Sequence, residues 1–276
     1  MLQAKTVVRK EINNHPYLFV NLVFGFFPIS FILGTLIVNL NLLLFCCLGI
    51  YYLKSKVVTT KFNFPIKIIF LFFLIIFFST GFNLAKTLYF EGYEAGNFVA
   101  FTKSILFFRF FLFLIIIYLL SKFNILRFKY FFLVAAFSSF LLSLDIIYQH
   151  FFGVDIAGLK GEKFHSSGFF GDEHIAGGYI QRFAFFAILY TILFFQNKNH
   201  AKFISTVIVI CILGTGILFS GNRVPLILFL FGLFFLFLLD FKIKKILFVG
   251  FVALLILIKF IISSDVSYKN VYISFS

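Results

Sequence analysis

Long apolar runs separated by short polar stretches are the main feature of the hydrophobic pattern along this chain. A helix needs about 20 predominantly apolar residues to cross the hydrocarbon core of a bilayer, and each run comes close to that length. The runs cover residues 17–33, 36–53, 66–84, 98–120, 130–148, 175–195, 203–219, 224–239 and 246–262. The pattern therefore predicts an all-α fold, a polytopic transmembrane helical bundle of about nine helices, forming a single membrane domain over residues 1–276.

The first two runs are nearly fused, which leaves a second count of helices open. Only Gly34 and Thr35 separate them, and Pro28 can kink or end the first run because a proline interrupts the hydrogen bonds of a helix interior. If one of these runs does not span the membrane by itself, the count is eight.

The composition excludes a water-soluble fold. Hydrophobic residues make up 62% of the chain, charged residues 12%, and the mean hydropathy is +1.08. Soluble domains average roughly 45–50% apolar and about 25% charged residues. The three cysteines, Cys46, Cys47 and Cys211, lie inside apolar runs and form no CxxC pair, so we interpret them as small helix residues and predict no metal site.

The net charge of +14 does not indicate a nucleic-acid partner, because the basic residues stand in short runs between apolar stretches. With nine helices, 15 of the 24 lysines and arginines lie on the side of the N-terminus, which the positive-inside rule makes cytoplasmic. These 15 are Lys5, Arg9, Lys10, Lys54, Lys56, Lys61, Lys67, Lys122, Arg127, Lys129, Lys198, Lys202, Lys242, Lys244 and Lys245. The C-terminus and the loops at residues 85–97, 149–174 and 220–223 are then predicted to face outward.

Three arginines lie in or at the start of predicted spanning helices. Arg109 and Arg182 fall within apolar runs, and Arg223 begins one. All three belong to even-numbered helices, whose N-termini face outward and carry a partial positive charge. This arrangement suits an anionic ligand, since the planar guanidinium binds phosphate in bidentate fashion. The alternative interpretation is a structural ion pair, or an anchor that reaches the membrane interface.

The stretch from residue 165 to residue 182, HSSGFFGDEHIAGGYIQR, is the richest in polar and small residues. Gly168 and Gly171 allow a tight turn, and Asp172 is a candidate N-cap for a helix that starts near Glu173. The longest predicted outer loop, residues 149–174, contains most of this stretch. It is where we expect chemistry.

On that predicted helix, His174, Gly178 and Arg182 follow one another at four-residue spacing and so share one face. A glycine between the histidine and the arginine leaves room for a bulky group to approach. The alternative is close packing of helices through Gly177 and Gly178.

Two further segments carry polar residues next to the ends of predicted helices. Asp145 and Gln149 share a face at the outer end of the fifth helix, followed by His150 and Asp155. They either line the same outward cavity or cap and solvate a helix end. The stretch Ser220-Gly-Asn-Arg-Val-Pro225 is typical of a turn into a helix, with Asn222 as a candidate cap.

The order of these motifs resembles the bacterial O-antigen ligase and O-antigen polymerase family. The resemblance rests on Asp145, Gln149, Gly153, Asp155 and Gly158, on SGFFGDEHIAGGYIQR, and on SGNR at residues 220–223. Members commonly have Arg-x-x-Gly-x-Phe-Gly-Asp before one helix and Ser-Gly-x-Arg before a later one; here His165 stands near the position of the first arginine. The resemblance covers residues 28–239 in layout.

The resemblance implies an inner-membrane enzyme that works at the periplasmic face in lipopolysaccharide biosynthesis, without metal, nucleotide or other cofactor. Its partners would be a polyprenyl-diphosphate-linked glycan, the lipid bilayer, and either the lipid A core or another carrier-linked repeat as acceptor. It would transfer or polymerise the glycan as an inverting-type glycosyltransferase. The resemblance gives Arg182 and Arg223, with Arg109 and His165, the role of holding the diphosphate, and assigns the glycan loop to Asp145, Gln149, Asp172 and Glu173.

The family also uses a general base, usually a histidine in a large periplasmic loop that would lie beyond Ser276. Within this chain His174 is the candidate base, and a truncated form is the interpretation we favour. The alternative function is a non-enzymatic transporter or flippase of an anionic lipid-linked substrate, and a third is a structural membrane subunit. The sequence does not distinguish ligase from polymerase.

Overall fold

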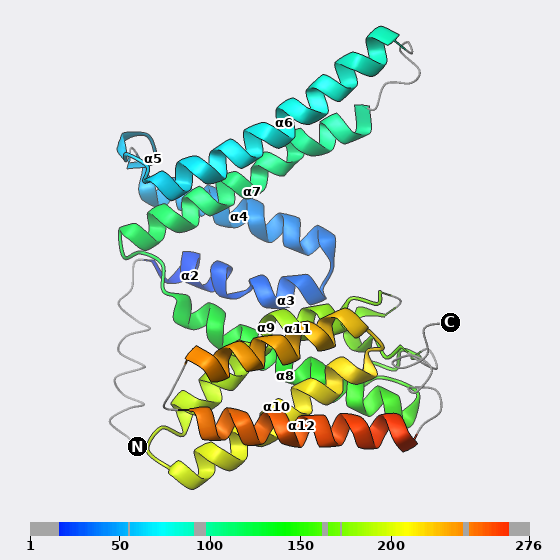
Figure 1. Ribbon diagram of the computed structural model, residues 1–276. Coiled ribbons are helices and arrows are strands. Elements are labelled where there is room, and N and C mark those ends of the chain that lie inside the picture. Colours follow the sequence, from blue (N-terminus) through cyan, green and yellow to red (C-terminus); the bar gives the residue numbers. More distant parts are fainter. Residues whose placement is uncertain are drawn as a thin grey trace. The chain divides into compact units, whose positions relative to one another are not determined.

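The computed structural model describes residues 17–54, 56–90, 98–161, 165–171, 173–239 and 243–264 (Figure 1). These residues are almost entirely helical, and the pairing of Val154 with Lys160 is an isolated bridge. The elements are α2 (Leu18–Gly25), α3 (Phe27–Ile32), α4 (Thr35–Leu53), α5 (Lys56–Thr59), α6 (Phe64–Phe90), α7 (Phe98–Lys122), α8 (Phe128–Phe152), the 3-10 helix η2 (Gly168–Phe170), α9 (Ala176–Phe194), α10 (Asn199–Phe219), α11 (Arg223–Leu239) and α12 (Lys244–Ser264).

Among the described helices, seven are long and apolar enough to cross a membrane: α4, α6, α7, α8, α9, α10 and α12. Two further apolar stretches, Leu18–Ile32 and Arg223–Leu238, are helical but shorter. They correspond to the first and eighth predicted runs. The predicted all-α, polytopic transmembrane helical bundle is therefore confirmed, and the chain is a multi-pass membrane protein.

The first predicted run is interrupted, although Pro28 does not end a helix. The break lies at Phe26, between α2 and α3, and Pro28 occupies the first turn of α3. A proline is tolerated there because the N–H groups of the first turn have no partner within the helix. The separation from α4 lies at Gly34, whose φ of +101° favours glycine.

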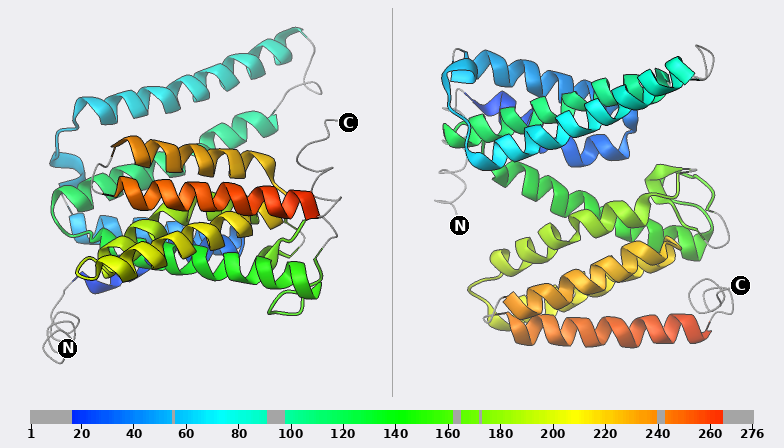
Figure 2. Two further views of the ribbon diagram at one scale, coloured as in Figure 1. Left: turned by 60° about the horizontal axis from the view of Figure 1, so that its bottom comes forward. Right: turned by 45° about the horizontal axis from the view of Figure 1, so that its top comes forward.

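The described helices fall into two compact units. Unit 1 comprises residues 17–24 and 39–127, and unit 2 comprises residues 25–38 and 128–264. In unit 1, α6 and α7 pair side by side through stacked phenylalanines, with the Phe73 and Phe107 ring centroids 5.0 Å apart (Figure 2). Unit 2 contains α3 and α8 to α12.

Small residues let the helices of unit 2 approach one another closely. A Cβ atom on Gly216 of α10 would lie 2.9 Å from the Cα atom of Ser143 on α8, so nothing larger than glycine fits there. Such contacts are typical of membrane proteins, where lipid chains compete with side chains for apolar contacts. The Tyr179 hydroxyl on α9 donates to the Pro28 carbonyl at 2.8 Å and lies 2.7 Å from the Ser138 hydroxyl, which holds α3 against α8 and α9.

The two ends of unit 2 differ. The C-termini of α8, α10 and α12 and the N-termini of α9 and α11 lie together with the connection between α8 and α9 (Figures 1 and 2). We call this the loop end. The opposite end, with the α9–α10 and α11–α12 turns, we call the turn end. The longest described connection in unit 2, between α8 and α9, therefore meets two helix N-termini.

Candidate functional site

The first part of the α8–α9 connection folds into a tight turn. Gly153 and Gly158 have φ values of +75° and +87°, and the backbone N–H of Gly161 donates to the Gly153 carbonyl at 3.1 Å. Asp155 is buried within the turn, where its Oδ1 atom accepts a hydrogen bond from the Leu159 N–H at 2.6 Å. The Asp155 carboxyl therefore shapes the loop from inside.

Asp145 and Gln149 attach this connection to the last turns of α8. The Asp145 Oδ1 atom accepts from the Ile156 N–H at 2.9 Å. The Gln149 Oε1 atom accepts from the Gly168 N–H at 2.9 Å, while its Nε2 donates to the Leu159 carbonyl at 3.3 Å. Both side chains are buried, at 0% and 1% exposure. They share a face of α8 as predicted, but they neither line an open cavity nor solvate a helix end.

Replacing Gln149 by alanine is expected to release both parts of the loop from α8. The buried Gly168 N–H would lose its acceptor, and leaving a buried donor unsatisfied costs about 1–3 kcal/mol. Hydrogen exchange should then rise in residues 153–161 and 165–171. Gln196→Ala, an exposed glutamine at the turn end, is the matched control and should leave this exchange unchanged. Unaltered protection in Gln149→Ala would show that other contacts hold the loop.

The second part of the connection packs against the α10–α11 turn. The backbone N–H of Ser166 donates to the Phe219 carbonyl at 3.2 Å, and the His165 Nδ1 atom lies 3.2 Å from the Ser220 carbonyl. The Asn222 side-chain amide donates to the His174 carbonyl at 2.9 Å. Three contacts therefore join the two segments that carry the predicted motifs.

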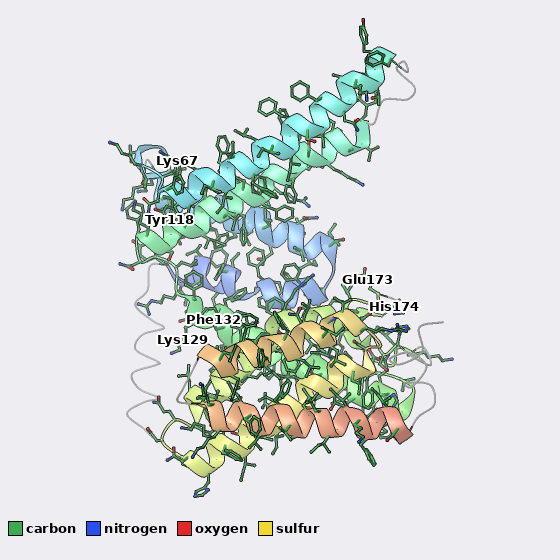
Figure 3. All side chains as sticks on the ribbon, in the orientation of Figure 1. Lys67, Tyr118, Lys129, Phe132, Glu173 and His174 are labelled. Carbon is green, nitrogen blue, oxygen red and sulfur yellow. The ribbon has the colours of Figure 1, made fainter. Side chains whose placement is uncertain are left out.

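The His165 and His174 rings lie next to each other, with centroids 4.9 Å apart. His165 is half-buried, and His174 is exposed at the loop end beside the exposed Glu173 (Figure 3). Because a carbonyl oxygen only accepts hydrogen bonds, the contact with Ser220 selects the His165 tautomer that carries its proton on Nδ1. In that tautomer the Nε2 atom is the acceptor, and a general base needs such an acceptor.

The prediction of a helix that starts near Glu173 is wrong. Helix α9 begins at Ala176, and its N-cap position is Ile175, which makes no side-chain cap. His174 lies in the turn that precedes the helix, where its carbonyl accepts a hydrogen bond from the Asn222 side-chain amide. His174 is therefore not on the helix face that carries Gly178 and Arg182. The predicted cap, Asp172, lies outside the described residues.

The adjacent glycines of α9 have different surroundings. A Cβ atom on Gly177 would overlap the Ser220 hydroxyl and lie 3.3 Å from the Asn222 Cβ atom, whereas a Cβ atom on Gly178 would meet nothing within 4 Å. Close helix packing, the alternative interpretation of this pair, therefore holds for Gly177 alone. Gly178 leaves the open space that the sequence predicted beside Arg182.

Arg182 and Arg223 belong to α9 and α11, two helices that pack against each other. Gly178, Arg182 and Phe185 form one stripe of α9, and the Phe185 ring packs against Phe229 of α11 at 5.6 Å between centroids. Arg182 is exposed on this stripe, about 9 Å along the helix axis from Ala176 at 1.5 Å per residue. Arg223, also exposed, is the first residue of α11.

One predicted arginine belongs elsewhere. Arg109 lies on α7 in unit 1, where its guanidinium carbon is 4.9 Å from the centroid of the Phe110 ring. The candidate site is therefore built from unit 2 and consists of His165, His174, Arg182, Asn222 and Arg223. Within the described part of the chain, no group of three histidine, cysteine, aspartate or glutamate side chains is placed to hold a metal ion.

The sequence does not reveal two residues, Ser220 and His150, whose contacts hold the candidate site together. The Ser220 carbonyl lies next to the His165 ring, and the Ser220 hydroxyl fills the space that a Cβ atom on Gly177 would need. His150 stacks on Phe219 with ring centroids 3.9 Å apart. Ser220 was recognised only as part of a turn, and His150 only as a loop residue. Their partners lie more than 40 residues away in the chain, and no local pattern signals such a pair.

Comparison with known proteins gives the chain no relative. No family model matches it, and no curated protein or solved structure is significantly similar to it. The function is therefore inferred from the geometry of the site and from the sequence motifs.

Proposed function

We propose that this protein binds a polyprenyl-diphosphate-linked glycan at the loop end of unit 2 and transfers or polymerises it, as O-antigen ligases and polymerases do. The loop end would face the periplasm of a bacterial inner membrane, with the N-terminus in the cytoplasm. The observation that carries the proposal is the contact between residues 165–174 and the α10–α11 turn. It gathers two histidines and Arg223 at the N-termini of α9 and α11.

The charge at this place favours a diphosphate. The N-terminus of an α-helix carries about half a positive charge, and unpaired N–H groups point away from it. Arg223 is the first residue of α11, and Arg182 adds a second guanidinium on the neighbouring helix α9. An arginine binds two phosphate oxygens at once, so two arginines match the two phosphates of a carrier lipid.

The histidines supply the proton acceptor that glycosyl transfer needs. In this reaction a hydroxyl of the acceptor attacks the anomeric carbon, and the bond from that carbon to the diphosphate oxygen breaks. The polyprenyl diphosphate leaves with the electron pair, which the arginines stabilise. The hydroxyl proton passes to a histidine. His165 has the tautomer for this step, and His174, the base predicted from sequence, lies ring to ring with it.

Replacing Arg182 or Arg223 by alanine is expected to weaken binding of farnesyl diphosphate, a short diphosphate probe, by about 10- to 100-fold. A hydrogen bond to a charged group contributes about 1.5–3 kcal/mol, and each 1.4 kcal/mol is tenfold in affinity. Calorimetric titration of the full chain in detergent measures this change. Cells that carry either variant should also lose assembly of their surface polysaccharide.

Lys259→Ala is the matched control, because it removes one exposed positive charge from α12 in the same unit. It should bind the probe as the parent protein does, and all three variants should reach the membrane in equal amounts. Normal surface polysaccharide in both arginine variants would contradict glycan transfer. If probe binding were lost while polysaccharide assembly stayed normal, an anion transporter would be the better interpretation.

A further inference from the structure

A feature separate from the candidate site lies in the half of unit 2 towards the turn end. A cavity of about 410 Å³ opens between α8, α9 and α10, which pack pairwise. Its lining includes Ala136 and Phe140 of α8, Ala187 and Thr191 of α9, and Ser205 and Val209 of α10. Pockets that hold small ligands occupy about 300–1,000 Å³, so the cavity is large enough for part of a lipid molecule.

The cavity lining is mostly apolar, and two of its hydroxyls, on Thr191 and Ser205, are already bonded to the backbone. Thr191 donates to the Ala187 carbonyl at 2.8 Å, and Ser205 donates to the Ala201 carbonyl at 2.6 Å. The rim carries Leu133, Phe137 and Tyr190, which are 42%, 60% and 41% exposed. Because these helices span a membrane, such a rim faces hydrocarbon. An acyl chain fits this lining, and water does not, since buried water needs two to four polar partners.

On two of the three helices, a lysine lies about one turn before the first lining residue, on the side of the turn end. Lys202, Ser205 and Val209 are spaced i, i+3 and i+7 on α10, so they form one stripe, and Lys198 precedes them by four residues. On α8, Lys129 precedes the lining residue Leu133 by four residues (Figure 3). Residues 195–209 include no aspartate or glutamate. The mouth of the cavity is therefore cationic above an apolar interior.

We infer that this cavity binds one anionic phospholipid, with an acyl chain between α8, α9 and α10 and the phosphate at Lys129 and Lys202. The lining from Leu133 to Phe140 extends about 10 Å along α8 at 1.5 Å per residue, which suits a chain that enters from the turn end. A zwitterionic lipid offers the same chain but a weaker match to the lysines. The site is separate from the one at the loop end, because their residues lie in opposite halves of α9.

Photo-crosslinking of the full chain in nanodiscs tests the inference. The probes are phosphatidylglycerol and phosphatidylcholine that carry the same diazirine-labelled acyl chain. Phosphatidylglycerol adducts should concentrate on the lining residues of α8, α9 and α10. Each lysine near a membrane surface favours an anionic lipid about fivefold, so the preference over phosphatidylcholine should be on the order of 25-fold for two lysines. The double variant Lys129→Gln, Lys202→Gln should abolish that preference.

Two variants test the cavity itself. Ser205→Phe fills it and should reduce adducts to the level of helices outside it, whereas Ser263→Phe on α12 makes the same change at an exposed position and should not. If Ser205→Phe does not fold, Thr191→Leu fills the same space. Adducts spread evenly over the lipid-facing helices, or equal labelling by the two probes, would overturn the inference. Displacement of the probe by an equal amount of polyprenyl phosphate would also overturn it and assign the cavity to the carrier lipid.

Discussion

Gly177→Val is expected to separate α9 from the α10–α11 turn, whereas Gly178→Val should leave the candidate site intact. The Cβ atom at position 177 would overlap the Ser220 hydroxyl, which donates to the Ile217 carbonyl at 2.7 Å, and would lie 3.2 Å from the Ser220 Cβ atom. Valine adds two further methyl groups to a position whose Cβ atom would already lie 3.3 Å from the Asn222 Cβ atom. Overpacking of this kind typically costs about 1–3 kcal/mol and occasionally more.

The overpacking should mainly disrupt the contact between the α8–α9 connection and the α10–α11 turn. As α9 moves away, the hydrogen bond from Asn222 to the His174 carbonyl breaks, and the His165 ring loses its place beside Ser220. Hydrogen exchange of residues 165–171 and 220–223 measures this change, and binding of farnesyl diphosphate should fall with it. Gly178→Val is the control, since open space surrounds that position. Equal exchange in the two variants would contradict the packing described for Gly177.

Gly168→Ala is expected to destabilise unit 2 by about 2–5 kcal/mol, the sum of a left-handed backbone and a clash. The φ of Gly168 is +55°, which costs other L-residues about 1–2 kcal/mol. An added Cβ atom would also lie 2.7 Å from the Asp145 Oδ2 atom and 3.0 Å from the Leu142 Cδ1 atom, and both residues are fully buried. The free energy of unfolding in mixed micelles measures the total.

Gly158→Ala separates the two contributions. Its φ of +87° imposes a comparable backbone strain, but an added Cβ atom would meet nothing within 4 Å. Gly158→Ala should therefore lose only the free energy that the backbone strain costs. Gly168→Ala should lose about 1–3 kcal/mol more of its free energy of unfolding. If the two variants lose the same stability, the contact between Gly168 and Asp145 is looser than the structure indicates.

The helices could be predicted from sequence because the bilayer imposes a single rule on them. Backbone groups in hydrocarbon must bond within their own segment, so a long apolar run such as residues 98–120 forms a helix whatever surrounds it. The structure begins α7 at Phe98 and extends it to Lys122. The division into two units could not be predicted, because it depends on which helix faces pack together. Nearly every face in this chain is apolar.

The sequence predicts individual residues of the candidate site, but it does not predict how these residues come together. The turn glycines, the exposed arginines and the two motif segments were all recognised from local residue types. The start of α9 differs from the prediction: the His174 carbonyl accepts a hydrogen bond from Asn222, a residue of another segment that no local pattern reveals. Asp145 and Gln149 were recognised as polar residues on one face, yet whether such residues meet water or a folded loop depends on distant backbone. Only the three-dimensional structure supplies that information.

The place of α3 in unit 2 has a consequence for biosynthesis. Its partner Tyr179 follows Pro28 by 151 residues, and the residues between them include almost all of unit 1. At a translation rate of about 5–20 residues per second, α3 leaves the ribosome about 8–30 s before that hydroxyl exists. During this interval six helical residues, too few to span a bilayer, must be sheltered by the insertion machinery or by lipid. Slowing translation between residues 39 and 127 would prolong the exposure, so the yield of folded protein should depend on elongation rate.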